Sequence, residues 1–189
     1  MREPWTPALA ALGRGAQEDG FAPPQCVTKT STATFPFRER AMTPAECEKI
    51  VSIIDAAADF TIATVRPDGW PQATTVSFVN DGLKLYFGTW IKSQKAQNIA
   101  ACDKVAVTID LPYKTWKDIR GLALSGHARK VDKPEELARV SELMFKKFPQ
   151  LSEFVTADAP EMAIYRVDPE IVSVLDYTKG FGQTELVRV

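Results

Sequence analysis

The chain has 189 residues, of which 45% are hydrophobic and 25% are charged, and its formal net charge is −1 at pH 7. This length allows one domain with a sizeable core but not two full ones. A general nucleic-acid binder usually carries a basic excess, so the near-zero charge argues against that class of partner. No apolar run reaches the roughly 18 residues needed to cross a bilayer, so a membrane partner is not expected either.

Three cysteines are present, Cys26, Cys47 and Cys102, which are widely spaced and form no CxxC pair. This spacing predicts neither a disulfide framework nor a zinc site, so no metal is expected. The N-terminus also lacks the continuous apolar stretch of a secretory signal. Together these features favour a cytoplasmic location.

The first 40 residues differ from the rest of the chain. They are rich in proline and small residues, contain the polar run TKTST at 28–32, and show no lasting amphipathic period. We therefore expect an extended arm over residues 1–40 and one folded domain over residues 41–189.

The first regular element that the sequence predicts is a helix over residues 44–57. The motif TPAE at 43–46 is a capping box with proline at the first helical position. Ile50, Ile53 and Ile54 then follow at helical spacing and give the helix an apolar face.

Three strands are expected next, over residues 60–65, 73–79 and 83–88, because these runs are rich in β-branched and aromatic residues. The motifs PDG at 67–69 and NDG at 80–82 are typical of tight turns. Three strands joined by two such turns form an antiparallel meander.

The remaining chain contains two further helices and several strands. In order, we expect a short helix at 93–101, strands at 105–111 and 121–131 separated by a polar, aromatic connection at 113–120, a helix opening at 133, and a last strand or strand pair at 162–168 and 171–177. This order lacks the βαβ alternation of a parallel sheet. It predicts an antiparallel barrel with helices in its connections.

His127 is the only histidine and lies inside an expected strand. A single histidine excludes a metal site built on two histidines of one chain, and no GxSxG motif accompanies it. We expect a structural or partly exposed histidine, with a haem ligand and a general base as the alternatives.

Two glycine-rich motifs, GRGAQE at 13–18 and GFGQTE at 180–185, begin like a dinucleotide fingerprint but lack its third glycine. Neither stands between a strand and a helix, and the chain has no P-loop. A nucleotide-like cofactor would therefore not be held by a Rossmann domain.

The segment LYFGTWIKSQK at 85–95 is the best candidate for a phosphate site. A helix N-terminus offers free N–H groups and a positive partial charge, and both attract phosphate. Polar side chains gather near the expected helix start: Thr89, Ser93, Gln94 and Lys95. The alternative interpretation is a surface helix capped by Ser93, with a solvated lysine in its first turn.

The second expected strand carries Thr74 and Thr75 side by side in the run PQATTVS at 71–77. Because side chains alternate between the faces of a strand, one threonine can line a groove while the other faces the core. Threonine also suits strands for stability alone, which is the alternative.

Several motifs occur in an order and spacing that indicate a family. They are ATVRPDGWPQ at 63–72, LYFGT at 85–89, SQKAQNI at 93–99, VAV at 105–107 and GLALSGHA at 121–128. Together they resemble the FMN-binding split barrel of the pyridoxamine 5′-phosphate oxidase-like superfamily, over residues 60–189. The tail LDYTKGFG at 175–182 resembles one subgroup of that superfamily.

The resemblance implies a mainly β (α+β) fold, an antiparallel split β-barrel with Greek-key features and flanking helices, and FMN bound at a homodimer interface. It implies that one strand contacts the flavin ring and ribityl chain through Gln72, Ala73, Thr74, Thr75 and Val76. The ring would also contact Gly88 and Thr89, and the phosphate would contact the helix start at Ser93, Gln94 and Lys95. The partner chain would supply Trp116 and Arg120.

The resemblance also implies an FMN-dependent oxidoreductase that acts on a small molecule, with no catalytic residue assigned. The alternatives are a deazaflavin (F420)-dependent reductase, a non-enzymatic haem- or flavin-binding stress or sensor protein, and a bare dimerisation module. True pyridoxamine-phosphate oxidases end in a basic, histidine-containing motif, whereas residues 180–189 hold no histidine and related tails often carry one where Gln183 stands. Pyridoxamine phosphate is therefore not the expected substrate.

Overall fold

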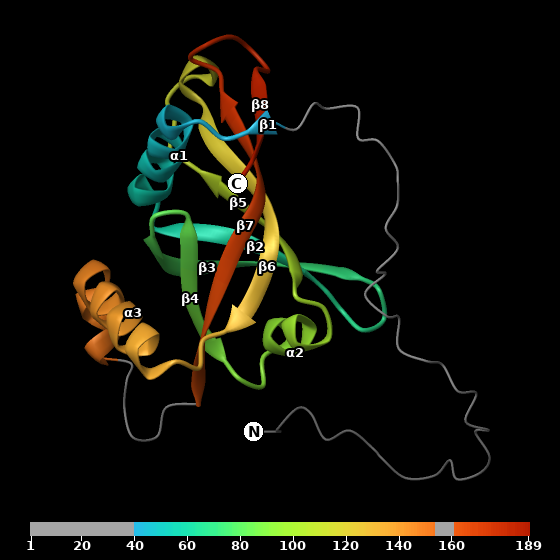
Figure 1. Ribbon diagram of the computed structural model, residues 1–189, viewed down its shortest axis with the longest axis vertical. Helices are drawn as coiled ribbons and strands as arrows, with labels where there is room; N and C mark the ends of the chain where they lie inside the picture. The colour runs from blue at the N-terminus through green and yellow to red at the C-terminus, as the bar shows by residue number, and fades with distance from the viewer. Residues whose placement is uncertain (1–39, 154–160) are drawn as a thin grey trace, which may run out of the picture.

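The computed structural model describes residues 40–153 and 161–189, so the arm expected over residues 1–40 lies almost wholly outside the described residues. In chain order the elements are β1 (Arg40–Ala41), α1 (Pro44–Ala56), β2 (Asp59–Val65), β3 (Pro71–Asp81), β4 (Lys84–Trp90), α2 (Gln94–Ala101), β5 (Lys104–Asp110), η1 (Trp116–Asp118), β6 (Arg120–Lys130), α3 (Pro134–Lys147), η2 (Pro149–Glu153), β7 (Met162–Asp176) and β8 (Thr184–Arg188) (Figure 1).

The strands form one sheet in the order β1-β8-β7-β4-β3-β2-β5-β6, and an additional pairing of β7 with β6 closes it. The result is a six-stranded antiparallel barrel with β8 and β1 added outside it. Strand β5 returns to lie beside β2 after the meander of β2, β3 and β4, which is a Greek-key order. The predicted mainly β split barrel with flanking helices is confirmed.

Local sequence signals account for the element boundaries. The Thr43 side chain accepts a hydrogen bond from the backbone N–H of Glu46, whose carboxylate accepts one from the Thr43 N–H, so the predicted capping box is present. Both predicted turns contain a glycine in the left-handed region, with φ of +87° at Gly69 and +60° at Gly82. The predicted helices and strands up to residue 131 agree with the structure to within about two residues.

The C-terminal part decides between the two alternatives that the sequence left open. The last strand is single and not a pair, because β7 runs unbroken past Pro169, where its register against β6 shifts next to Gly126. A Cβ atom on Gly126 would lie 2.2 Å from the carbonyl oxygen of Asp168, so only glycine allows this close approach. The tail, for which the sequence predicted no element, contains β8, which pairs with β7.

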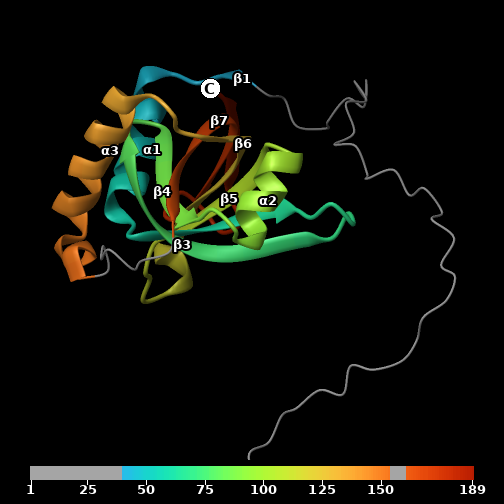
Figure 2. The same cartoon turned by 90° about the horizontal axis from the view of Figure 1, so that it is seen from below.

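The barrel interior is packed with side chains. Phe60 lies against Phe78 and Phe87, with ring centroids 4.9 and 5.7 Å away, and α1 adds the buried Ile50 and Ile53. Figures 1 and 2 place α1 and α3 on one side of the barrel and α2 on the other. Because aromatic and aliphatic side chains fill the lumen, a ligand site is expected on the outside of the barrel.

Two observations concern cysteines and metals. Cys47 is a free thiol, but Cys102 is disulfide-bonded. The sequence did not predict this bond at Cys102, because spacing along the sequence does not report proximity in the fold. In the described ranges, no cluster of His, Cys, Asp and Glu could hold a metal ion. Nor does that part of the chain contain a helix long and apolar enough to cross a membrane.

Candidate functional site

The barrel is split between β3 and β4. These strands pair only from Phe78 with Phe87 to Asp81 with Lys84. Beyond that point the outer part of β3 stays paired with β2 alone, while the end of β4 pairs with β7. Figures 1 and 2 show the β2–β3 hairpin leaving the barrel sideways, on the side where α2 lies. Within the described chain, no strand covers the edge of β3 over residues 71–77, so its backbone N–H and C=O groups are open to another partner.

The predicted strand residues alternate along this edge. Gln72, Thr74 and Val76 are half-buried, whereas Ala73 and Thr75 are exposed on the other face. The Thr75 hydroxyl lies 3.2 Å from that of Thr61 on the outer surface. The Thr74 Oγ1 atom is buried without a hydrogen-bond partner in the described structure. The two adjacent threonines thus point to opposite faces as predicted, and the inward one is available to a ligand.

A buried amide network ties α2 to the split. Asn98 is fully buried, and its amide nitrogen donates to Thr64 Oγ1 at 2.9 Å and to Gln72 Oε1 at 3.0 Å. Its oxygen accepts from the Gln94 amide at 2.9 Å. Of the predicted ligand residues, Gln72 therefore ties α2 to β3, whereas Gln94 bonds to Asn98 within α2 itself. The sequence analysis missed Asn98, although a polar residue between the buried Ala96 and Ile99 was the available signal.

The start of α2 brings together three predicted polar residues. Ser93 is the N-cap, and its hydroxyl accepts a hydrogen bond from the Ala96 N–H at 3.3 Å. The same hydroxyl lies 3.2 Å from Thr89 Oγ1. The Lys95 ammonium lies 3.5 Å from the same Thr89 Oγ1 atom. Two hydroxyls and one cation thus meet at a helix N-terminus, where an anion is favoured.

Lys95 has no negative partner among the described residues. Its side chain is partly buried, and this burial lowers the pKa of its ammonium. No carboxylate of the described residues forms an ion pair with it, and Thr89 is its hydrogen-bond acceptor. A desolvated cation without a counter-ion is unfavourable, and an incoming phosphate would supply the missing charge.

Gly88 lies beside the start of α2, whereas the two residues expected from a partner chain, Trp116 and Arg120, lie far from it. Gly88 precedes Thr89 on β4, and a Cβ there would be 3.6 Å from Ile164, so the chain's own packing does not require glycine. Arg120 pairs with Asp176 on β7, whereas Thr89 pairs with Ala163. These points are separated along β7 by about 40 Å at roughly 3.3 Å per residue. Trp116 and Arg120 therefore cannot join the α2 site of their own chain.

His127 lies between carboxylates. Its Nδ1 atom is 2.8 Å from Asp103 Oδ2, although without the alignment of a hydrogen bond, and its Nε2 atom is 3.3 Å from Glu170 Oε1. Because both ring nitrogens face carboxylates, neither is free to ligate a haem iron. The arrangement fits the expected structural histidine better than the alternatives.

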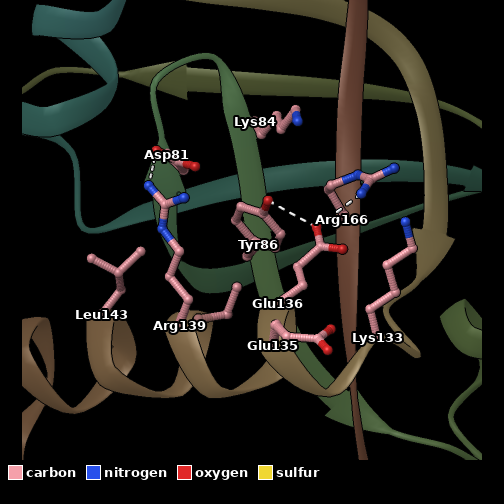
Figure 3. Close-up of a pocket in the computed structure, with 10 residues that line it drawn as sticks. Asp81, Lys84, Tyr86, Lys133, Glu135, Glu136, Arg139, Leu143 and Arg166 are labelled. Atoms are coloured by element: carbon pink, nitrogen blue, oxygen red, sulfur yellow. Dashed lines mark hydrogen bonds and ion pairs between the residues drawn. The ribbon is translucent and has the colours of Figure 1, made fainter.

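A separate polar cavity of about 360 Å³ lies between α3 and strands β3, β4 and β7 (Figure 3). The Tyr86 hydroxyl donates to Glu136 at 3.0 Å, and Arg166 donates to the same carboxylate at 2.8 Å. Burial and the nearby Glu136 raise the pKa of Tyr86 to about 12, so it stays a donor. Arg139 pairs with Asp81 across the same cavity. These contacts fasten α3 to the barrel, and none of the predicted ligand residues takes part.

Comparison with known proteins agrees with this fold. A family model described as pyridoxamine 5′-phosphate oxidase matches residues 47–176. No curated protein sequence matches the chain.

Solved structures extend the similarity. The heme binding protein from Mycobacterium smegmatis has a TM-score of 0.66 and 17% identity, over 78% of this chain and 60% of that one. A conserved hypothetical protein from Mycobacterium tuberculosis has a TM-score of 0.62 and 25% identity, over 77% and 92%. General Stress Protein 26 from Bacillus anthracis has a TM-score of 0.56 and 21% identity, over 76% and 98%. With the family model spanning most of the barrel, the chain belongs to the pyridoxamine 5′-phosphate oxidase family.

Proposed function

We propose that this protein is an FMN-binding flavoprotein, an oxidoreductase on a small molecule, whose cofactor phosphate binds at the start of α2. The observation that carries the proposal is the partly buried Lys95 ammonium, which has Thr89 as neighbour and no carboxylate partner in the described chain. A phosphate there would accept hydrogen bonds from the ammonium, from the Thr89 and Ser93 hydroxyls and from free N–H groups of the helix.

The split edge of β3 fits the flavin itself. The isoalloxazine ring is flat and has a polar edge of N–H and C=O groups, which the open backbone of residues 71–77 can match. Thr74 adds a buried hydroxyl that lacks a partner within the described part of the chain. When bound, FMN supplies hydride transfer at its N5 atom, and this chain's residues bind and orient it. We assign no side chain to acid or base chemistry.

The site is proposed to be completed by a second copy of the chain. The outer faces of four neighbouring strands carry two rows of small, uncharged residues. Across β3, β2, β5 and β6 these rows are Ala73, Ala63, Ala106 and Ser125, and Thr75, Thr61, Thr108 and Ala123. A two-row patch of small, uncharged residues, bordered on β5 by Lys104 and Asp110, suits the close approach of an identical patch about a two-fold axis. Such a dimer would also allow the partner's Trp116 and Arg120 to approach the flavin.

The two cofactor alternatives make different demands. Haem is suggested by the names of several structural neighbours, such as the heme binding protein from Mycobacterium smegmatis. In this chain, however, His127 has a carboxylate at each ring nitrogen. Deazaflavin F420 needs a basic groove for its long anionic tail, towards which Lys92 and Lys95 give only a modest contribution. FMN is therefore the better fit.

The purified full-length chain tests the proposal directly. We expect absorption maxima typical of oxidised flavin, or uptake of one FMN per chain on titration, with the mass of FMN in the released ligand. Lys95→Gln is expected to weaken FMN binding by about tenfold or more, because a charge-assisted hydrogen bond is lost. Lys92→Gln, which changes an exposed lysine three residues away, is the matched control. A colourless chain that takes up no FMN contradicts the proposal, and a Soret band or a bound F420 identifies the alternative.

A further inference from the structure

Three aromatic side chains gather at the end of β7 that lies farthest from α2. The Trp116 and Phe181 rings are 6.1 Å apart with an interplanar angle of 23°, and the Tyr177 ring lies 5.1 Å from Phe181. They come from η1 and from the turn after β7. Trp116 is 67% exposed and Phe181 is 78% exposed. Side chains of this size are seldom presented to water together unless they meet a ligand or a partner.

The turn that carries Phe181 is held by its own backbone. Lys179 N–H donates to Asp176 O at 3.3 Å, Gly180 N–H to Tyr177 O at 3.2 Å, and Gln183 N–H to Gly180 O at 3.2 Å. The turn is therefore built to present Phe181 outwards and is not a frayed tail. The buried Asp176 carboxylate, which accepts from the Thr178 hydroxyl at 2.6 Å, anchors its first residue.

The rings border a cavity of about 670 Å³ between η1 and the turn. Its lining surface is predominantly apolar, and its polar and charged side chains are those of Lys117, Asp118, Thr178 and Lys179. A cavity of this size with apolar walls and a few polar groups matches a small-molecule site. Nearly parallel aromatic planes favour a flat partner over a bulky one, because stacking needs a planar face.

We propose that this aromatic cavity, bounded by Trp116, Tyr177 and Phe181, binds the planar ring of a small-molecule substrate. The role as a substrate site rests on the proposed flavin function, because the cavity lies far from the α2 site of its own chain and reaches a flavin only in the partner subunit. Ring binding itself does not depend on the flavin. The substrate class is therefore a flat, mainly apolar aromatic molecule of one or two fused rings.

The test uses the full chain, saturated with FMN and also without it, and two probes of equal connectivity. The probes are 2-naphthol, which is flat, and decahydro-2-naphthol, which is not, and binding is followed by calorimetry. We expect the flat probe to bind roughly tenfold more tightly. Phe181→Ala is expected to weaken 2-naphthol binding roughly three- to tenfold and to leave the FMN affinity unchanged. Trp70→Ala removes a tryptophan that is similarly exposed, at 71%, but lies outside the cavity, and should have no effect.

The outcomes separate this inference from the proposed function. Equal affinity for the two probes, or equal affinity in Phe181→Ala and Trp70→Ala, overturns the ring site even if FMN binds. If the chain takes up no FMN but still selects 2-naphthol through Phe181, the ring site is supported and the flavin function fails. If Phe181→Ala converts a dimer to a monomer without changing 2-naphthol binding, the cluster is a contact between copies and the ring site is overturned.

Discussion

The Lys95 ammonium and the Thr89 hydroxyl lie 3.5 Å apart at the start of α2. Thr89 is the point where β4 has left β3, and Lys95 is in the first turn of the helix that follows. The pair therefore joins the split in the sheet to the helix N-terminus. A ligand with a flat polar ring and a phosphate would touch both features at once.

The affinity for FMN is expected to fall as the pH rises, and to do so at a lower pH than the ordinary pKa of a lysine would give. Burial lowers the pKa of Lys95 in the free chain, so its ammonium discharges at a lower pH than usual. A bound phosphate favours the charged form and raises that pKa, so tight binding is present at low pH and is lost as the lysine discharges. Quenching of flavin fluorescence between about pH 7 and about pH 10 measures the change.

Lys95→Arg is the matched variant for this pH dependence. Its guanidinium stays charged over the whole range, so the decline should disappear even if the absolute affinity changes. A flat profile in the unaltered chain, or the same decline in Lys95→Arg, would show that another group governs binding.

Ala106→Arg is expected to break the proposed dimer and with it FMN binding. Ala106 is exposed in the centre of the small-residue face, paired with Ala63 on one side and Ser125 on the other. A bulky cation there prevents close approach and would be buried against its symmetry mate. Light scattering should give the 20.9 kDa of one chain. Ala138→Arg, an exposed site on α3, is the control and should stay dimeric. An unaltered chain that is already monomeric removes the basis of the prediction.

Asn98→Ala is expected to destabilise the fold by about 2–4 kcal/mol. The fully buried amide holds Thr64, Gln72 and Gln94, and its removal leaves these polar groups without their partner. Gln97→Ala changes the neighbouring exposed amide and should cost well under about 1 kcal/mol. Urea unfolding of the two variants gives the comparison. Similar losses would mean that the buried network contributes little.

Gly126→Ala is expected to cost more than about 3 kcal/mol or to prevent folding. A methyl group there would lie 2.2 Å from the carbonyl oxygen of Asp168, which is backbone and cannot turn aside. At Gly88 the nearest atom would be 3.6 Å away, so Gly88→Ala should fold normally. Thermal unfolding monitored by circular dichroism distinguishes them, and a Gly126→Ala chain as stable as the Gly88→Ala chain would refute the close approach.

Stability in acid is expected to depend on Glu136. The hydrogen bond from Arg166 lowers the pKa of this carboxyl below its ordinary value of 4.5. A lowered pKa in the folded state means that the stabilisation is complete above the ordinary value and is lost as the pH falls through the folded value. Urea midpoints should therefore drop in this acid range for the unaltered chain. The drop should be smaller in Glu136→Gln than in Glu135→Gln, which changes the adjacent exposed carboxylate.

Local signals made most of the fold predictable. The capping box at Thr43, the Ser93 cap and the glycine turns depend on a few neighbouring residues, and the structure has all of them. The alternation of Thr74 and Thr75 follows from the geometry of any strand. The strand β8 and the choice between one strand and two at β7 were not predictable in this way, because a five-residue strand and a tolerated Pro169 depend on partners distant in sequence.

The candidate site shows the same division. Thr89, Ser93 and Lys95 lie within seven residues of one another, so their meeting could be expected from the sequence, and the structure brings them together. The Asn98 network spans three elements, and its one local signal, a polar residue between apolar ones in the expected helix, does not identify the partners of that residue. The position of the split could likewise not be predicted from the sequence, because it depends on where the pairing of β4 with β3 ends while its pairing with β7 continues.

The open edge of β3 has a consequence for the protein in a crowded cell. An unpaired strand edge invites any extended peptide to add to it, including the same edge of another molecule. A flavin seated along residues 71–77 would occupy that edge as a substitute strand. Under this proposal, the concentration of FMN also affects aggregation. Molecules without FMN expose the unpaired edge of β3, and molecules with FMN bound do not.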